Sequence, residues 1–212
     1  MRLRNIASDF QVLRDTVFDN EYRLASLDAR CAVVDVGAHV GCFALLAWAA
    51  GARRIVCVEP DPDNFRLLEE NLAELRAAGV DATAIQAAVW AAEQGPARFR
   101  AGDQSTVGRV GDDGDEVDAV TLGYLLGVAG RDKTPVGLVK IDIEGGEFGL
   151  LRHTPPEVLA RAGAYAVEVH PDAGNPGEIA DRLRRAGFDE QVWHAGSGRT
   201  GTLQLHASRA DA

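Results

Sequence analysis

The stretches CAVVDVGAHVG (residues 31–41) and RIVCVEPDPDNF (residues 54–65) decide the fold. Each begins as a run of apolar and β-branched residues, which is typical of a strand buried on both faces of a parallel sheet. The first run ends in glycines and leads into an Ala- and Leu-rich helix. The second stops at Pro60 and leads into a helix that Asp61 can cap. This order of strand, glycine turn, helix and strand predicts a Rossmann-like α/β domain.

The same alternation continues along the rest of the chain. Further strands are predicted over residues 81–89, 136–147 and 164–170. A short helix is expected with Thr154 as its cap and Pro155 at its first position, and a C-terminal antiparallel hairpin is expected around Gly196–Gly201. We predict one domain over residues 1–212, with a mostly parallel sheet and helices on both faces. Within it, residues 1–30 should form a helical cap, and the Gly- and Asp-rich residues 102–118 a flexible loop near the acceptor site.

Charge and composition exclude several classes of protein. The chain has 22 Lys and Arg against 32 Asp and Glu, a net charge of −10, so a broad phosphate-binding face is not expected. Its three cysteines (Cys31, Cys42 and Cys57) lack the spacing of a zinc site. The longest apolar run, Phe43–Ala50, is far shorter than the roughly 20 residues that span a bilayer. The N-terminal residues lack the apolar segment of a signal peptide. We therefore expect a cytoplasmic protein with no nucleic-acid or membrane partner.

The turn after the first strand predicts a nucleoside site. Its glycines, Gly37 and Gly41, have GxxxG spacing, whereas dinucleotide-binding proteins have GxGxxG, whose second glycine gives the pyrophosphate room. Glu59 ends the second strand, 24 positions after Asp35. An acid in that position can accept hydrogen bonds from both hydroxyls of a ribose. The combination predicts adenosine binding and favours S-adenosylmethionine (SAM) over NAD.

Acids and a histidine mark the ends of the next two predicted strands. Strand alternation would place Asp142 and Glu144 on the same side of the sheet edge. Glu168 and His170 end the neighbouring strand in the same way. These groups could orient the methionine end of SAM, bind the substrate, hold a metal ion or act as a base. The residues alone leave these roles open.

In order and spacing these segments resemble the FkbM family of SAM-dependent methyltransferases. The resemblance covers roughly residues 15–170 and is carried by VVDVGAHVG, RIVCVEPDPDNFRLLEENL, AAV, VTL and VKIDIEGGE, with Tyr22 in the upstream NEYRL. The chain departs from the family at Gly123 and Tyr124, where an acidic pair is usual, and at His39, where asparagine is usual.

The resemblance implies methylation of a hydroxyl on a small molecule, such as a natural product, sugar or glycan. It implies that Asp35, Gly37, Gly41 and Glu59 contact SAM and that Asp142 and Glu144 face the reacting end. The full set of expected SAM contacts is Asp35, Gly37, Ala38, His39, Gly41, Glu59, Pro60, Gln86, Ala87 and Asp142.

For the chemical step we expect His170 as the base, because the pKa of imidazole lies nearest neutrality, with Glu144 second and Asp142 beside them. A divalent metal is the alternative, with Asp142, Glu144, Glu168 and His170 as candidate ligands. The acceptor is not identified. The oligomeric state is also left open, with a homodimer among the alternatives.

Two other functions share these features. An NAD(P)-dependent oxidoreductase has the same fold and ribose acid, but the missing GxGxxG counts against it. A catalytically silent SAM- or nucleoside-binding protein would not need Asp142 and Glu144, which are both present.

Overall fold

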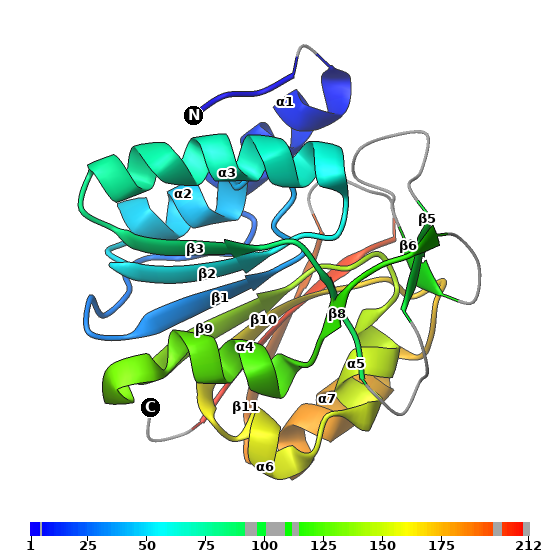
Figure 1. Cartoon of the computed structure of the whole chain (residues 1–212). Coiled ribbons are helices and arrows are strands. Elements are labelled where there is room, and N and C mark those ends of the chain that lie inside the picture. The colour runs from blue at the N-terminus through cyan, green and yellow to red at the C-terminus, as the bar shows by residue number, and fades with distance from the viewer. Residues whose placement is uncertain (5, 92–96, 101–108, 112–114, 197–200, 210–212) are drawn as a thin grey trace.

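A seven-stranded sheet forms the centre of the protein (Figure 1). The computed structural model describes residues 1–4, 6–91, 97–100, 109–111, 115–196 and 201–209. The strand order is β11-β12-β10-β9-β1-β2-β3. The bounds are β1 (Ala32–Val36), β2 (Arg54–Val58), β3 (Asp81–Ile85), β9 (Val136–Ile141), β10 (Ala162–Val169), β11 (Glu190–Ala195) and β12 (Leu203–Ser208). Of these seven strands, only β12 runs antiparallel to the others. The mostly parallel sheet and the antiparallel C-terminal strands confirm the predicted fold class.

Helices cover both faces of this sheet, as predicted (Figure 1). They are α1 (Ala7–Leu13), which continues into a π-helical turn (Arg14–Phe18), α2 (Cys42–Ala49), α3 (Pro62–Ala77), α4 (Leu122–Ala129), α5 (Glu147–His153), α6 (Pro156–Leu159) and α7 (Pro176–Arg185). Side chains of β1 alternate between the two layers: Val33 packs with α2 and α3, whereas Val34 and Val36 pack with α4 to α7. Burial on both faces explains why the strands read as continuous apolar runs.

Smaller strands extend beyond the main sheet. β4 (Ala88–Val89) pairs with β8 (Ala119–Val120), so the segment predicted as one strand over residues 81–89 forms two. β5 (Arg98–Arg100) pairs with β6 (Arg109–Gly111) and β7 (Asp115–Glu116). The predicted flexible loop over residues 102–118 thus contains two short strands. The rest of its Gly- and Asp-rich part, residues 102–108 and 112–114, lies outside the described residues.

The chain after β9 differs from the prediction. The strand stops at Ile141, and an unpredicted helix, α5, begins at Glu147. The short helix expected after Thr154 is present as α6, which begins at Pro156. Thr154 lies between α5 and α6, and its hydroxyl donates to the carbonyl of Leu150 at 2.7 Å instead of capping α6. Asp142 and Glu144 therefore lie in a turn, where Glu144 has a φ of 53°. We expected strand alternation to place these two side chains on the same side. In the structure it is the turn that brings them together.

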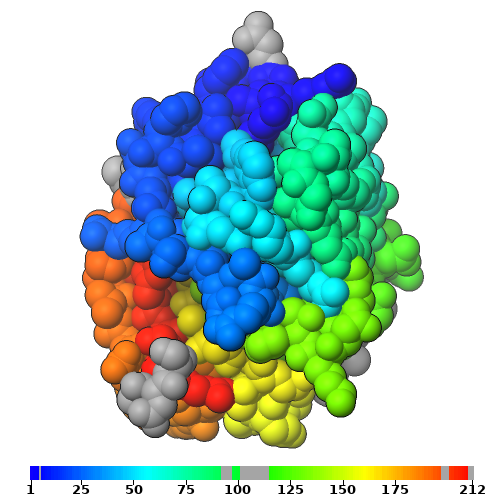
Figure 2. Space-filling view, turned by 90° about the vertical axis from the view of Figure 1, so that its left-hand side faces the viewer, coloured from blue at the N-terminus to red at the C-terminus, as the bar shows by residue number. Residues whose placement is uncertain are grey.

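The N-terminal residues pack against the start of α2 and the outer side of α3, as Figure 2 shows in dark blue and cyan. The side-chain amide of Asn71 donates to the carbonyls of Arg2 and Val40, at 2.9 and 2.8 Å. The guanidinium of Arg4 donates to Asp9 and Asn64, at 2.8 Å each. The segment is thereby tied to the turn that follows β1. None of the helices described is long and apolar enough to span a bilayer.

Candidate active site

The turn between β1 and α2 needs glycine for two reasons. Gly37 and Gly41 have φ values of 76° and 93°, in the left-handed region that glycine adopts without penalty. A Cβ at Gly37 would also lie 1.9 Å from the carbonyl oxygen of Asp142, so the end of β1 packs directly against the segment after β9. The two predicted halves of the site are therefore in contact at Gly37.

Glu59 lies beneath this turn, at the end of β2, and its side chain is buried. Its Oε2 accepts a hydrogen bond from the backbone N–H of His39 at 2.9 Å. Its Oε1 accepts from the backbone N–H of Asp61 at 3.1 Å and from the Asn64 amide at 3.2 Å. Burial raises the pKa of Glu59 to about 7, although these hydrogen bonds oppose the shift. A buried carboxylate held by neutral N–H groups suits further neutral donors, such as ribose hydroxyls.

His39 combines a backbone role in the turn with contacts to the N-terminal segment. Its ring Nε2 lies 3.2 Å from Arg4 Nη2 and 3.6 Å from Asp9 Oδ1. Burial lowers the pKa of His39 to about 4, so the ring is neutral at physiological pH. The N-terminal residues therefore cover the predicted cofactor turn.

The other predicted cofactor residues lie close to these elements in the chain. Ala38 is buried within the turn, and Pro60 is half-buried beyond β2. At the end of β3, Gln86 is exposed and Ala87 buried. The backbone N–H of Glu59 donates to the carbonyl of Ile85 at 3.1 Å, which joins the ends of β2 and β3.

Lys140 is the main residue that the sequence analysis missed. It is 3% exposed, and its Nζ donates to the carbonyl of Gly37 at 2.7 Å. The same nitrogen lies 3.2 Å from Asp35 Oδ1 and 3.8 Å from Asp142 Oδ2. Burial disfavours the ammonium charge, but the two carboxylates outweigh it and raise the pKa of Lys140.

A signal for this pair was present in the sequence. Asp35 and Lys140 each interrupt an apolar run, and the structure makes them register partners on β1 and β9. Opposite charges in two buried strands have to pair, because an isolated charge is costly to bury. The fully buried Asp35 carboxylate is therefore neutralised from within the protein, and Lys140 joins the cofactor turn to Asp142.

Beyond β9 and β10, Asp142, Glu144 and His170 form a cluster. One potential ligand atom from each lies within 4.8 Å of the others. His170 is buried, and its Nε2 is 3.4 Å from Glu144 Oε2. Burial disfavours the imidazolium. The hydrogen bond to Glu147 and the charges of Asp142, Glu147 and Glu144 outweigh this effect and raise the pKa of His170 to about 9.

Glu168, also a predicted metal ligand, does not belong to this cluster. It lies within β10, opposite Gln204 of β12. Burial and the nearby charge of Asp142 raise the pKa of its carboxyl well above the usual range, which favours the neutral form.

Glu147 is the second residue that the sequence analysis missed. It is fully buried at the start of α5 and contacts both sides of the cluster. Its Oε1 accepts from the backbone N–H of His170 at 2.8 Å and lies 3.1 Å from the ring Nδ1. Its Oε2 accepts from the backbone N–H of Gly145 at 2.8 Å. Because residues 136–147 were predicted as a strand and α5 was not predicted, this glutamate had no predicted place in the site.

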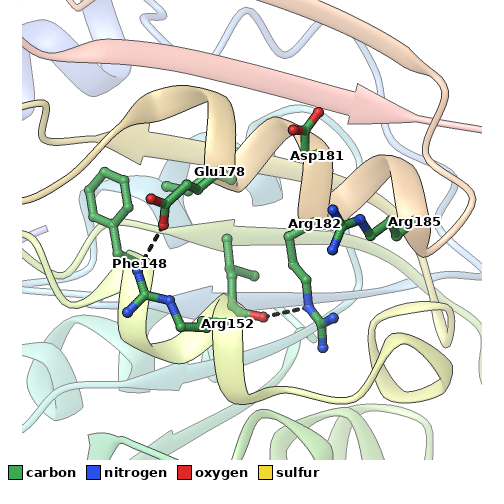
Figure 3. A pocket seen from close by; sticks show the side chains of 8 residues that line it. Phe148, Arg152, Glu178, Asp181, Arg182 and Arg185 are labelled. Atoms are coloured by element: carbon green, nitrogen blue, oxygen red, sulfur yellow. Dashed lines mark hydrogen bonds and ion pairs between the residues drawn. The ribbon is translucent and has the colours of Figure 1, made fainter.

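A separate cavity of about 240 Å³ lies between α5 and α7 (Figure 3). Its lining residues are Phe148, Leu151, Arg152, Glu178, Ile179, Asp181, Arg182 and Arg185. Glu178 pairs with Arg152 at 2.7 Å, and Arg182 donates to the carbonyl of Leu151 at 3.0 Å. None of the predicted site residues lines this cavity, so it does not take part in the site described above.

Comparisons with known proteins agree with this architecture. The profile of the Methyltransferase FkbM domain matches residues 35–190. A search of curated proteins finds no match. The fold is similar to that of a methyltransferase FkbM from Methylobacillus flagellatus KT (TM-score 0.58, 13% identity, 91% of this chain and 47% of that one). This chain therefore spans about half the length of that protein.

Other methyltransferases share the fold. A magnesium protoporphyrin IX methyltransferase from Synechocystis PCC 6803, solved with bound SAM, matches with a TM-score of 0.52 and 16% identity over 99% of this chain and 86% of that one. An rRNA methylase from Streptococcus thermophilus matches with a TM-score of 0.51 and 11% identity over 98% and 99%. At such identities these similarities concern the fold alone.

Proposed function

The chain belongs to the FkbM family of methyltransferases, and from that premise we propose that it transfers a methyl group from SAM to a hydroxyl of a small molecule. The proposal rests on one observation: a group of residues suited to SAM and a group suited to an acceptor lie at the same edge of the sheet. The buried Glu59 lies beneath the glycine turn, and Asp142, Glu144 and His170 cluster beyond the neighbouring strands. Lys140 contacts the turn and Asp142 together.

The residues of the first group fit SAM. Glu59 would accept the ribose hydroxyls, and backbone groups of residues 37–41 would face the ligand without room for a pyrophosphate. Gln86 and Ala87 would lie toward the adenine, and Asp142 toward the methionine amino group. When bound, SAM supplies a methyl group already activated on a sulfonium, so alignment with the acceptor oxygen provides much of the rate.

The second group of residues would act on the acceptor. His170 would take the hydroxyl proton once it has lost its own, with Glu144 as the second candidate. Two carboxylates and an imidazole also form a mixed oxygen and nitrogen donor set that fits a divalent transition metal. A metal held by Asp142, Glu144 and His170 would supply Lewis acidity that lowers the pKa of the acceptor alcohol.

A small acceptor is favoured over a nucleic acid by electrostatics. The chain carries a net charge of −10, and two carboxylates lie in the cluster itself. Such a surface repels a phosphate backbone. We therefore expect this chain to share its fold, but not its substrate, with the rRNA methylase.

Titration calorimetry tests the cofactor assignment directly. SAM should bind and NAD should not, because the turn lacks the glycine that admits a pyrophosphate. Glu59→Ala should weaken SAM binding by about 1.5–3 kcal/mol, since it removes charge-assisted hydrogen bonds. The exposed Glu157→Ala is the matched control and should bind normally. Measurable NAD affinity with no SAM binding, or unchanged SAM affinity in a folded Glu59→Ala protein, would refute the assignment.

SAM affinity should also depend on pH through Glu59. With the pKa of this carboxyl at about 7, it is mostly protonated at pH 6 and mostly ionised at pH 8. Because the ionised form is the better acceptor for two hydroxyls, SAM should bind about tenfold more weakly at pH 6 than at pH 8. Glu59→Gln cannot titrate and serves as the control for the titration of SAM itself. The same pH profile in both proteins would contradict the role of Glu59.

A further inference from the structure

The position of Glu147 is unusual for a carboxylate. Its side chain is fully buried at the start of α5, where its neighbours in sequence Phe148, Leu150 and Leu151 are buried and apolar. Burying an ionised carboxylate is costly unless its oxygens are hydrogen-bonded. An apolar side chain would fill such a place at lower cost, so the hydrogen bonds of Glu147 require an explanation.

Those hydrogen bonds join the two segments that carry the cluster. Oε1 accepts from the backbone N–H of His170 at 2.8 Å, and Oε2 accepts from the backbone N–H of Gly145 at 2.8 Å. Gly145 follows Glu144 directly, and its φ of 96° belongs to the turn that places Glu144. A single carboxylate therefore sets the spacing between the end of β10 and the turn after β9.

The same carboxylate also orients the imidazole. Oε1 lies 3.1 Å from His170 Nδ1. An ionised carboxylate can only accept hydrogen bonds, so this contact requires the hydrogen on Nδ1. The opposite ring nitrogen, Nε2, faces Glu144 at 3.4 Å and the rest of the cluster. In the neutral ring, a hydrogen held on Nδ1 leaves Nε2 without one. Whether His170 takes a proton or binds a metal, Nε2 is the atom that must be available.

We propose that Glu147 is a positioning residue, which fixes the orientation and tautomer of His170 and holds it against the Glu144 turn. This inference rests on the proposed function in one respect, because it assumes that His170 acts on the acceptor. Glutamine cannot replace Glu147, because both carboxylate oxygens face N–H donors and an amide supplies only one acceptor. In a Glu147→Gln protein, one donor must face another. If the NH2 group faces His170, the ring loses its acceptor; if it faces Gly145, the Glu144 turn loses its acceptor and His170 keeps only a weaker, neutral one.

The first test needs no acceptor. In protein labelled with ¹⁵N-histidine and free of ligand, His170 should show a slowly exchanging Nδ1 proton far downfield of the amide region. Glu147→Gln should shift that signal upfield or abolish it, because a neutral amide is a weaker acceptor than a carboxylate. Two controls should keep it: Glu157→Gln, an exposed glutamate on α6, and Leu151→Ala, which destabilises α5 without touching the carboxylate. An Nδ1 signal that is unchanged in Glu147→Gln, or is missing from the wild type, would overturn the proposal.

The second test separates positioning from folding. With an acceptor found by release of S-adenosylhomocysteine from a panel of sugars, macrolides and phenols, Glu147→Gln should lower kcat about 10- to 100-fold. The Kd for SAM should stay within about twofold of the wild-type value. Glu147→Asp retains two acceptor oxygens and should recover part of kcat. Unchanged kcat in Glu147→Gln, or equal losses in Leu151→Ala and Glu147→Gln, would overturn the positioning role.

The two tests fail in different ways. If the wild type binds no SAM or methylates no acceptor, the proposed function fails while the Nδ1 signal still decides the role of Glu147. If Glu147→Gln does not fold, Glu147→Asp takes its place in the NMR test. A weaker or shifted Nδ1 signal would then support the proposal, and an unchanged signal would refute it.

Discussion

Replacing His170 with alanine is expected to lower kcat by about 100- to 10,000-fold, the usual contribution of a general base. His170 lies in the cluster with Asp142 and Glu144, whereas the carboxylate of Glu59 is held by residues of the glycine turn and α3. SAM affinity should therefore stay within about twofold, as expected for a residue that acts mainly on the transition state. Release of S-adenosylhomocysteine measures turnover, and calorimetry measures the Kd for SAM.

The controls for this prediction separate three mechanisms. His153→Ala removes an exposed histidine at the end of α5 and should leave kcat unchanged. If a metal acts in place of a free base, EDTA should abolish turnover, and Mn²⁺ or Mg²⁺ should restore it. Full activity in His170→Ala, together with indifference to EDTA, would exclude both mechanisms. Glu144→Gln would then decide between Glu144 as the base and alignment alone.

Replacing Lys140 with methionine is expected to lower the free energy of unfolding by about 3–5 kcal/mol, as when one partner of a buried ion pair is removed. The change leaves the Asp35 carboxylate buried without its cation, and the Gly37 carbonyl without the Nζ donor. Methionine has nearly the shape of the lysine stem, so lost packing contributes little. Urea unfolding, followed by circular dichroism, measures the effect.

The chain offers a matched control for this variant, because Lys133 is its only other lysine. Lys133 is exposed, and Lys133→Met should change stability by less than about 0.5 kcal/mol. Adding Asp35→Asn to Lys140→Met should restore much of the lost free energy of unfolding, since neither partner of the buried ion pair then carries a charge. A Lys140→Met protein as stable as the wild type would show that the pair contributes nothing to stability.

The local pattern of apolar runs, turns and helix caps was enough to predict the fold. Continuous apolar runs ending in glycine or proline, separated by helices with recognisable caps, predict a parallel sheet covered on both faces, and the structure has one. The polar residues at or near strand ends, Asp35, Glu59, Asp142 and His170, were also found, because they interrupt the apolar runs. The carboxyl ends of neighbouring parallel strands meet at one edge, so polar residues there converge without further information.

The segment after β9 could not be predicted in this way. Its turn depends on the left-handed φ of Glu144 and Gly145, and α5 is only seven residues long. A helix this short has almost no stability of its own and forms because its apolar face packs in the core. Propensity and spacing therefore predicted a strand up to Glu147 and no helix over residues 147–153, and the role of Glu147 was missed.

The sequence alone determines the family, the parallel sheet and the residue types at the edge of that sheet. All three depend on hydrophobic periodicity and on short motifs of neighbouring residues. The partners of those groups were decided by tertiary structure. Lys140 meets Asp35 because two strands align in register, and Glu147 meets His170 because a short helix packs beside the end of β10. Both contacts join residues more than 20 positions apart, and no local preference specifies which buried charge will face which donor.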